Sequence, residues 1–358
     1  MKKEIILQTD RQTDRQTDRQ TDRQTDRQNN CINLFRLIAA LEVAYGHTIV
    51  HMNIQTSNVI NSVFGYFQGV PIFFILSGFL IWDSVERSKN YYSYLRKRFW
   101  RIYPELWVGV AFEIIVLAIL YNITNIKQFI LFIVTQATCF QFWTPSSLRG
   151  YGCGTPNGAL WTICVMIQFY VIIWFIRKLL HNTSRLIWGI SFSVTIVLGM
   201  FPGLLEGRIP EILLKLYEQT IFNYLYLFLA GAFLAEYRNK IMKIIIKYWW
   251  LFTISAVVFY SVNMDIPFTR YAIIKNVLSV IGIIGFSYAF PKLNIKTDIS
   301  YGLYIYHMTI VNAMITLGFT GKIKYMFLAL LISIVLAWMS TKTIGALAVK
   351  KKTIVTHN

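Results

Sequence analysis

The sequence predicts an all-α membrane protein, a polytopic bundle of transmembrane helices, on three observations. Of its 358 residues, 55% are hydrophobic and 16% aromatic, and the mean hydropathy is +0.48, a composition outside the range of soluble globular domains. The apolar residues form continuous runs near the length that crosses the hydrocarbon core, without the alternation of barrel strands. Basic residues gather in the segments that separate alternate runs, as in membrane proteins with a fixed orientation.

The apolar runs predict about ten membrane spans. They cover residues 32–52, 63–82, 104–121, 159–176, 186–203, 219–235, 248–262, 270–290, 299–318 and 325–345. A further apolar stretch at 126–142 is interpreted as a re-entrant or interfacial segment. Counting that stretch as an eleventh span would place several basic loops on the opposite side of the membrane.

The distribution of charge predicts the orientation of the chain. The net charge is +18, and residues 1–30 carry seven basic and six acidic side chains, so the excess belongs to the part that follows. The basic loops hold Arg87, Lys89, Arg96, Lys97, Arg98, Arg101, Arg177, Lys178, Arg185, Arg238, Lys240, Lys243, Lys247, Lys292, Lys296, Lys350, Lys351 and Lys352. If these loops are cytoplasmic, both termini lie on the cytoplasmic side of a bacterial inner membrane. We expect no cleavable signal peptide, because residues 5–7 are too short an apolar region.

Three parts are expected along the chain: a disordered tail at 1–30, a membrane domain at 31–347 and a short basic cytoplasmic tail at 348–358. In the first, the tetrapeptide TDRQ occurs five times without interruption from Thr9 to Gln28 and contains no apolar residue from which to build a core. Codons ACA, GAC, AGA and CAG in series form a repeated tetranucleotide. Gain or loss of one unit would keep TDRQ but shift the frame of everything after it. We hypothesise a phase-variable gene; the alternative is a solvated linker.

The first long apolar run, LFRLIAALEVAYGH at 34–47, carries Arg36 and His47. Eleven positions at about 3.6 residues per turn return the second side chain to nearly the same face, roughly 16 Å further along the helix. Ionisable groups inside a membrane are costly and indicate function. Arginine can hold a phosphate and histidine can accept a proton near neutral pH, although a histidine that only packs is the alternative. Glu42 lies on another face, so Arg36 or another helix has to compensate its charge.

Other segments carry further candidates. Arg98 and Arg101 in RFWRIYP are three residues apart and share one helical face, where two guanidiniums can hold phosphates; the alternative is a role in topology alone. Pro104 is expected in the first turn of the next span. Ser77 in GVPIFFILSGFLIW lies in a small-residue notch and lacks a local base. Other candidates for a polar cavity or an acceptor site are Trp161, Gln168, Tyr170 and His307.

The cysteines do not suggest a metal site. Cys31, Cys139, Cys153 and Cys164 lack the spacing of metal ligands. Cys139 and Cys153 can pair if they face an oxidising compartment, but buried thiols are the simpler interpretation.

Four blocks in order resemble the acyltransferase-3 family of bacterial integral-membrane O-acyltransferases, which acetylate surface polysaccharides, lipopolysaccharide, peptidoglycan and antibiotics. These blocks are Arg36 with His47, FFILSGF at 73–79, RFWRIYP at 98–104, and SYGLYIYH ending at His307. The resemblance implies a ten-helix core with acetyl-CoA as a cytoplasmic donor substrate. It also implies that His47 is catalytic with Arg36 as its partner, and that Arg98 and Arg101 bind the CoA end.

The sequence departs from the family at one position and ends soon after its last span. Many relatives have a glutamate where this chain has Met166, so that role is not carried over, and Glu42 or Gln168 are the candidates to replace it. No appended soluble esterase-like domain is expected. The charged groups on one helix and the RxxR loop favour an enzyme over a glycan transporter or flippase, which would more often show inverted repeats.

The resemblance therefore implies an O-acetyltransferase, and we expect no permanently bound cofactor and no metal. Its expected partners are acetyl-CoA, an envelope glycan (lipopolysaccharide, lipooligosaccharide or capsule) or a lipid-linked glycan, and the lipid bilayer, with no nucleic acid. His47 acts either as a general base on a sugar hydroxyl or as a transient acyl carrier.

Overall fold

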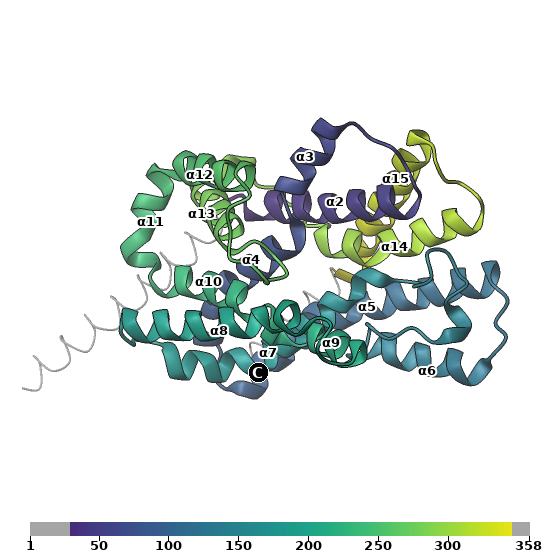
Figure 1. The fold of residues 1–358 in the computed structure, drawn as a ribbon, viewed down its shortest axis with the longest axis horizontal. Helices are drawn as coiled ribbons and strands as arrows, with labels where there is room; N and C mark the ends of the chain where they lie inside the picture. Colours follow the sequence, from purple (N-terminus) through teal and green to yellow (C-terminus); the bar gives the residue numbers. More distant parts are fainter. Residues whose placement is uncertain (1–28, 346–358) are drawn as a thin grey trace, which may run out of the picture.

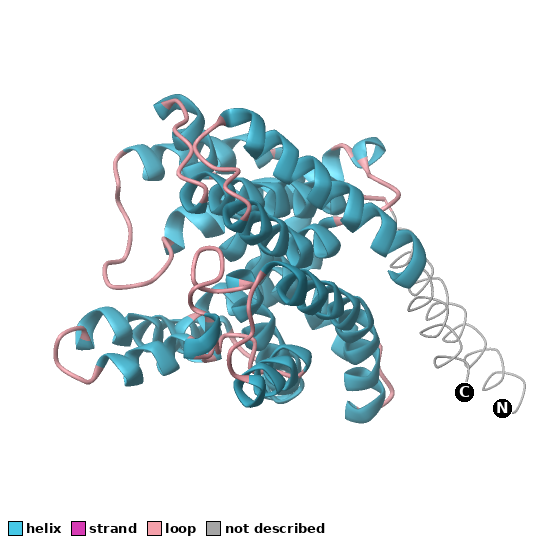
Figure 2. Ribbon diagram, turned by 90° about the vertical axis from the view of Figure 1, so that its right-hand side faces the viewer, coloured by secondary structure: helices cyan, strands magenta, loops and turns pink. Residues whose placement is uncertain are grey.

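The computed structural model describes residues 29–345, which form a bundle of helices with no strand in that range (Figures 1 and 2). The helices are α2 (Ile32–His51), α3 (Asn58–Tyr66), α4 (Gly69–Glu86), α5 (Tyr91–Leu120), α6 (Ile126–Ala137), α7 (Trp161–Leu180), α8 (Arg185–Leu205), α9 (Glu211–Glu218), α10 (Leu225–Glu236), α11 (Arg238–Lys247), α12 (Trp249–Ser261), α13 (Ile273–Ala289), α14 (Ser300–Thr316) and α15 (Ile323–Ser340). The predicted all-α class is confirmed. The TDRQ repeat at 9–28, nearly all of the expected tail at 1–30 and the basic tail at 348–358 lie outside the described residues.

Five helical segments of the described chain are long and apolar enough to cross a membrane. They are Asn58–Glu86, Tyr91–Leu120, Gly158–Leu180, Arg185–Leu205 and Ile323–Ile344, and the bent pair α11 and α12, which meet at 79°, can supply a sixth. The predicted ten spans are not confirmed on this measure. Several expected spans form shorter helices, such as α10 and α13, and α2 carries Arg36, Glu42 and two histidines along its length.

The expected start of the third span, at residue 104, needs correction. Helix α5 begins at Tyr91 and continues through Pro104, which lies inside the helix and not in its first turn. A capping box explains the earlier start, because Asn90 accepts a hydrogen bond from the backbone N–H of Ser93 at 2.8 Å and the Ser93 side chain reciprocates. Within the segment 126–142, residues 126–137 form α6, whose twelve residues span about 18 Å and cannot cross the hydrocarbon core alone.

The centre of the bundle is the contact between α4 and α10. Gly78 and Gly231 allow this close approach, because a Cβ atom at Gly78 would meet the carbonyl oxygen of Phe228 and one at Gly231 would meet that of Ile75. Small residues let helix backbones approach in this way. A second group of helices, α2, α14 and α15, packs beside it and appears at the upper right of Figure 1. These contacts place α2 between α4 and α14, so its two faces meet different neighbours.

Candidate functional site

The first part of the site is a pair of histidines from helices far apart in the sequence. The Nδ1 atom of His47 on α2 lies 2.9 Å from the Nε2 atom of His307 on α14. The two rings are nearly parallel, with an interplanar angle of 14°. His307 is 1% exposed and His47 is half-buried. On the far side of His307, its Nδ1 atom lies 3.1 Å from the carbonyl oxygen of Leu303.

These contacts define the protonation of both neutral rings. A carbonyl oxygen only accepts hydrogen bonds, so Nδ1 of His307 carries the proton and donates it to Leu303. The Nε2 atom of His307 is then an acceptor, and Nδ1 of His47 donates to it. This assignment from the hydrogen-bond network leaves the lone pair of His47 on Nε2. His47 is therefore arranged to accept a proton, or to attack an electrophile, through Nε2.

The second part of the site is a shared ion pair near the start of α2. Arg36 pairs with the Asp298 carboxylate, and a guanidinium nitrogen of Arg101 lies 3.7 Å from the same oxygen. Ser300 donates from its backbone N–H, at 3.1 Å, and from its hydroxyl to the other carboxylate oxygen. Burial raises the pKa of Asp298, but the charges of Arg36 and Arg101 and the bonds from Ser300 outweigh it and hold the pKa below its ordinary value.

A cavity of about 110 Å³ extends from this ion pair between α2, α4, α5, α7 and α14. Its charged end is formed by Arg36 and Arg101, and its other walls include Phe73, Met166 and Tyr304. Tyr304 lies one turn before His307, with ring centroids 5.8 Å apart. We call this the inner cavity; its lining residue Tyr304 connects it to the ring of His307.

A larger cavity of about 500 Å³ lies where α4 ends, beside the beginnings of α2 and α11 and the end of α13. Arg87, Arg98 and Arg238 line it, and we call it the arginine cavity. Arg98 donates to the Ser84 hydroxyl at 2.6 Å, and its guanidinium lies 5.7 Å from the ring centre of Tyr170, which lines the inner cavity. The two cavities are therefore neighbours on either side of Arg98 and Tyr170.

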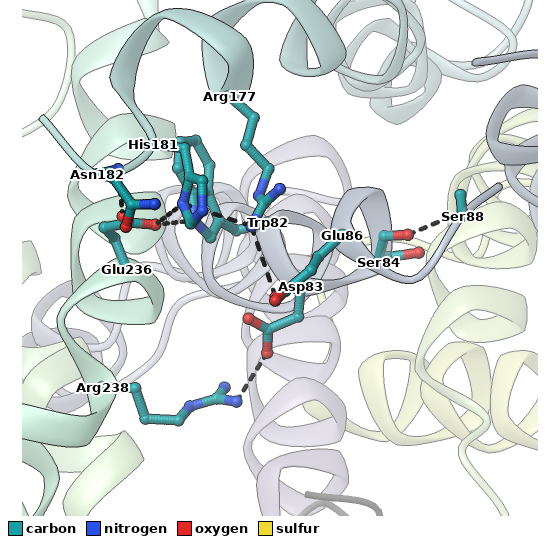
Figure 3. Close-up of polar contacts among 10 residues, drawn as sticks. All are labelled: Trp82, Asp83, Ser84, Glu86, Ser88, Arg177, His181, Asn182, Glu236 and Arg238. Atoms are coloured by element: carbon teal, nitrogen blue, oxygen red, sulfur yellow. Dashed lines mark hydrogen bonds and ion pairs between the residues drawn. The ribbon is translucent and has the colours of Figure 1, made fainter. Parts of the chain in front are cut away.

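A network of polar contacts holds the end of α4 in place (Figure 3). Glu236 accepts hydrogen bonds from the Trp82 indole at 2.8 Å and from the backbone N–H of Asn182 at 2.9 Å, and it also contacts His181. Two ion pairs flank this group, Arg238 with Asp83 at 2.7 Å and Arg177 with Glu86 at 3.5 Å. The network joins α4 to α7, α10 and α11 next to the arginine cavity.

Comparison with known proteins assigns the family. Residues 29–342 match the sequence profile described as "Acyltransferase domain" of the acyltransferase-3 type. The chain belongs to the acyltransferase-3 family. It is an acyltransferase, as the resemblance of the four sequence blocks predicted.

Two relatives of this acyltransferase match over most of their length. "Nodulation protein 10" of Rhizobium leguminosarum bv. viciae is 29% identical over 321 residues, covering 82% of this chain and 85% of the relative. The "O-acetyl transferase" of Shigella phage Sf6 is 26% identical over 325 residues, covering 87% and 93%. No solved structure matches the acyltransferase.

The structure distributes the predicted site residues of the acyltransferase over different surroundings. Arg36, Arg101, Ser77 and Tyr170 line the inner cavity, and Arg98 lines the arginine cavity. The RxxR pair therefore faces two neighbouring cavities, although sequence spacing predicted a single face. One turn of a broad helix face is enough to divide them between different partners, Asp298 for Arg101 and Ser84 for Arg98.

Two predicted cavity residues lie elsewhere. Gln168 donates to the carbonyl of Gln219 at 2.8 Å and accepts from the N–H of Ile221 at 3.1 Å, so it fastens α7 to the segment before α10. Trp161 packs against Tyr224 and lies under the Arg270 guanidinium, 5.2 Å from its ring centre. Neither is among the residues that line the two described cavities.

The candidate replacements for the family glutamate are engaged in other contacts. Glu42 accepts a hydrogen bond from the backbone N–H of Gly69 at 2.7 Å and so caps the start of α4. Met166 lines the inner cavity as an apolar side chain. The group that orients His47 is His307, which the sequence had marked only as a possible cavity or acceptor residue.

Sequence reasoning missed Asp298, the partner of Arg36. A signal was present, because only two acidic residues, Asp265 and Asp298, follow Glu236 in the chain. Asp298 lies two residues before the first residue of the SYGLYIYH block. A negative charge is unusual among these basic loops and indicates a specific partner. The sequence left open whether Cys139 and Cys153 form a disulfide. In the structure all four thiols are free, so these two cysteines are not paired.

Proposed function

We propose that this acyltransferase is an O-acetyltransferase that moves an acetyl group from cytoplasmic acetyl-CoA to a hydroxyl of a cell-envelope glycan, such as lipopolysaccharide, lipooligosaccharide or capsule. The observation that carries the proposal is the hydrogen bond between His47 and His307, which leaves a basic nitrogen on a half-buried ring. The O-acetyl transferase named among the relatives supports the acetyl group and the oxygen acceptor.

The donor enters from the end of the bundle that carries Arg36, Arg98 and Arg101. Arg98 and Arg101 bind the phosphates of CoA, since guanidinium groups form charge-assisted bonds with phosphate oxygens. The thioester arm occupies the inner cavity, whose walls are mainly apolar beyond the arginines. Arg36, held by Asp298, lies at the entrance of that cavity.

At the other end of the arm, His47 removes the proton from the acceptor hydroxyl through Nε2. The hydroxyl oxygen attacks the thioester carbonyl, the carbon–sulfur bond breaks, and the departing thiolate takes the proton from His47. General-base assistance of this kind supplies about 10² to 10⁴ in rate. His307 is a positioning residue, because it holds His47 in the tautomer whose Nε2 atom is free.

The same nitrogen would serve if His47 carried the acetyl group transiently, so a direct test separates the two roles. Purified protein is incubated with acetyl-CoA and no acceptor, then digested and analysed by mass spectrometry. The base mechanism predicts no acetyl group on the His47 peptide. Acetylated His47 would establish the carrier mechanism in its place.

The function is tested by incubating membranes with acetyl-CoA labelled in the acetyl group and measuring label in the glycan. The wild-type protein is expected to transfer label, and His47→Ala is expected to abolish transfer at an unchanged protein level. His51→Gln is the control, since His51 is an exposed histidine one turn further along α2. Label transfer by His47→Ala membranes, or none by wild type with any envelope glycan, would refute the proposal.

The acceptor and the regulation of the gene can be examined together. We propose that the TDRQ coding repeat switches expression, and that both termini of the protein lie in the cytoplasm of a bacterium. Mass spectrometry of the surface glycan with the gene in frame and out of frame should differ by one acetyl group per modified unit. Mixed codons in the repeat would contradict the switching mechanism.

A further inference from the structure

The arginine cavity contains more positive charge than the RxxR pair accounts for. Three guanidiniums from different segments converge on it: Arg87 after α4, Arg98 on α5 and Arg238 at the start of α11. No acidic residue is among the described residues that line it. Its volume of about 500 Å³ is within the range of small-molecule sites.

Two of these arginines are fixed before any ligand arrives. Arg238 is held by Asp83 at 2.7 Å (Figure 3). Its guanidinium lies 4.4 Å from the ring centre of Phe79. Arg98 is held by Ser84 at 2.6 Å. Asp83 and Ser84 are consecutive residues of α4, so one helical turn positions two cations from two other helices. Side chains that are already ordered lose less entropy on binding.

This preorganisation distinguishes the cavity from ordinary basic residues at a membrane boundary. Residues that serve topology or attract anionic lipid are usually extended and solvated. Arg98 and Arg238 are instead partly buried, and only Arg87 is exposed. Polar donors complete the lining, including the side chains of Asn33 and Asn294. Three cations with amide donors match a ligand that carries several phosphate oxygens.

The position of the cavity relates that ligand to the reaction. Tyr170 lines the inner cavity and its ring lies 5.7 Å from the Arg98 guanidinium. A donor with its phosphates in the arginine cavity can therefore extend past Tyr170 into the inner cavity, with its thioester toward His47.

We infer that Arg87 and Arg238, together with Arg98, bind the phosphate-bearing nucleotide end of the acyl donor in the arginine cavity. This inference rests on the proposed function. It adds two residues from outside the sequence blocks that resemble the family, and it divides the donor between two cavities. Arg101, beside Arg36 and Asp298 in the inner cavity, then binds the donor phosphate that is nearest the thioester arm.

The test compares Arg87→Gln with Lys89→Gln in purified protein held in nanodiscs of zwitterionic lipid. Arg87 and Lys89 are both exposed and lie in the same turn after α4, and each substitution removes one positive charge. Only Arg87 lines the arginine cavity. Affinity for CoA is measured by calorimetry. Arg87→Gln is expected to weaken CoA binding about tenfold, the effect of about 1.4 kcal/mol, while Lys89→Gln leaves it unchanged.

An acetyl donor without phosphates provides the second comparison. S-acetylpantetheine retains the thioester arm, so Arg87→Gln should leave its kcat/KM unchanged while raising the KM for acetyl-CoA. Arg238→Lys, which retains a cation beside Asp83, should raise that KM less than Arg238→Gln does. Equal effects of Arg87→Gln on both donors would overturn the inference, because the arginine would then act on something other than the phosphates.

The outcomes separate this inference from the proposed function. If wild type binds CoA and transfers acetyl groups but Arg87→Gln and Arg238→Gln behave as wild type, the cavity is not the nucleotide site and the function stands. If wild type neither binds CoA nor uses acetyl-CoA, the proposed function fails and the inference with it. If anionic lipid in the nanodisc abolishes CoA binding to wild type but not to Arg87→Gln, the cavity holds a lipid headgroup and the inference is wrong.

Discussion

The Nδ1 atom of His47 lies 2.9 Å from the Nε2 atom of His307, and this contact joins two blocks of sequence that are 260 residues apart. His307 is held in turn by the carbonyl oxygen of Leu303 on its own helix. The direction of these two hydrogen bonds, from His47 to His307 and from His307 to Leu303, determines that Nε2 of His47 is free. In the proposed mechanism, His307 therefore acts on the reaction only through His47.

The first prediction concerns His307. His307→Ala removes the acceptor for Nδ1–H of His47, so His47 samples both tautomers and orientations, and acetyl transfer should fall about 100-fold. The Oε1 atom of His307→Gln can take the place of Nε2 as an acceptor, so this variant should retain more activity than alanine. His307→Asn is shorter and should resemble alanine. The measurement is kcat with labelled acetyl-CoA, at matched amounts of folded protein.

A purely structural role for His307 would give a different pattern. Alanine, asparagine and glutamine would then reduce activity in proportion to their loss of thermal stability. The KM for acetyl-CoA is expected to stay near the wild-type value in all three, because His307 lies outside both described cavity linings.

The second prediction concerns the ion pair of Arg36 and Asp298. The side chains are 22% and 15% exposed, and removing one partner of a mostly buried pair costs about 3 kcal/mol, since the other charge is left uncompensated. Asp298→Asn and Arg36→Gln should each lower Tm and acetyl transfer. The double variant should lose less stability than the sum of the two. Additive losses in a thermal-shift cycle would show that the pair is not coupled.

The third prediction concerns acid stability. The pKa of Asp298 is held below its ordinary value of 3.8, so the folded protein binds this proton less readily than the unfolded chain does. The stabilising contribution is therefore fully present above about pH 4 and is lost as the pH falls through the lowered pKa. The difference in Tm between wild type and Asp298→Asn should stay constant from pH 7 to about pH 5 and decrease below about pH 4. A difference that grows toward low pH would contradict this sign.

Local sequence predicted candidate residues for the site, but it did not predict which residues contact one another. Helical periodicity predicts that Arg36 and His47 share one face of α2. The affinity of guanidinium groups for phosphate makes Arg98 and Arg101 candidates for binding a phosphate. The partners of these residues, Asp298 and His307, are supplied by α14 and the turn before it. Periodicity within one helix carries no information on which helix packs against it, so those pairs required the tertiary structure.

The fold shows the same division. The apolar runs predicted helices at nearly every position, because a backbone in lipid must satisfy its own hydrogen bonds. The apolar runs did not predict where a helix breaks or bends, as at the 79° bend between α11 and α12. The spacing of Arg98 and Arg101 likewise did not predict their separate partners: Ser84 contacts Arg98, Asp298 contacts Arg101, and the two arginines line different cavities.

The fourth prediction tests the contact on which both cavities depend. Helix α4 supplies Ser77 to the inner cavity and Ser84 to the arginine cavity, and it is held against α10 by Gly78 and Gly231. An alanine at Gly231 would push its methyl group against the carbonyl oxygen of Ile75. Backbone cannot yield as a side chain can, so Gly231→Ala should cost about 1–3 kcal/mol and lower Tm.

Gly189→Ala is the matched control for that prediction, since Gly189 lies in α8 with open space around it and alanine favours helix by up to about 1 kcal/mol. It should leave Tm unchanged or raise it. Acetyl transfer by Gly231→Ala should fall together with CoA affinity, because a displaced α4 moves the residues that line both cavities. Unchanged Tm and CoA affinity in Gly231→Ala would mean that the α4 and α10 contact does not hold the cavities in shape.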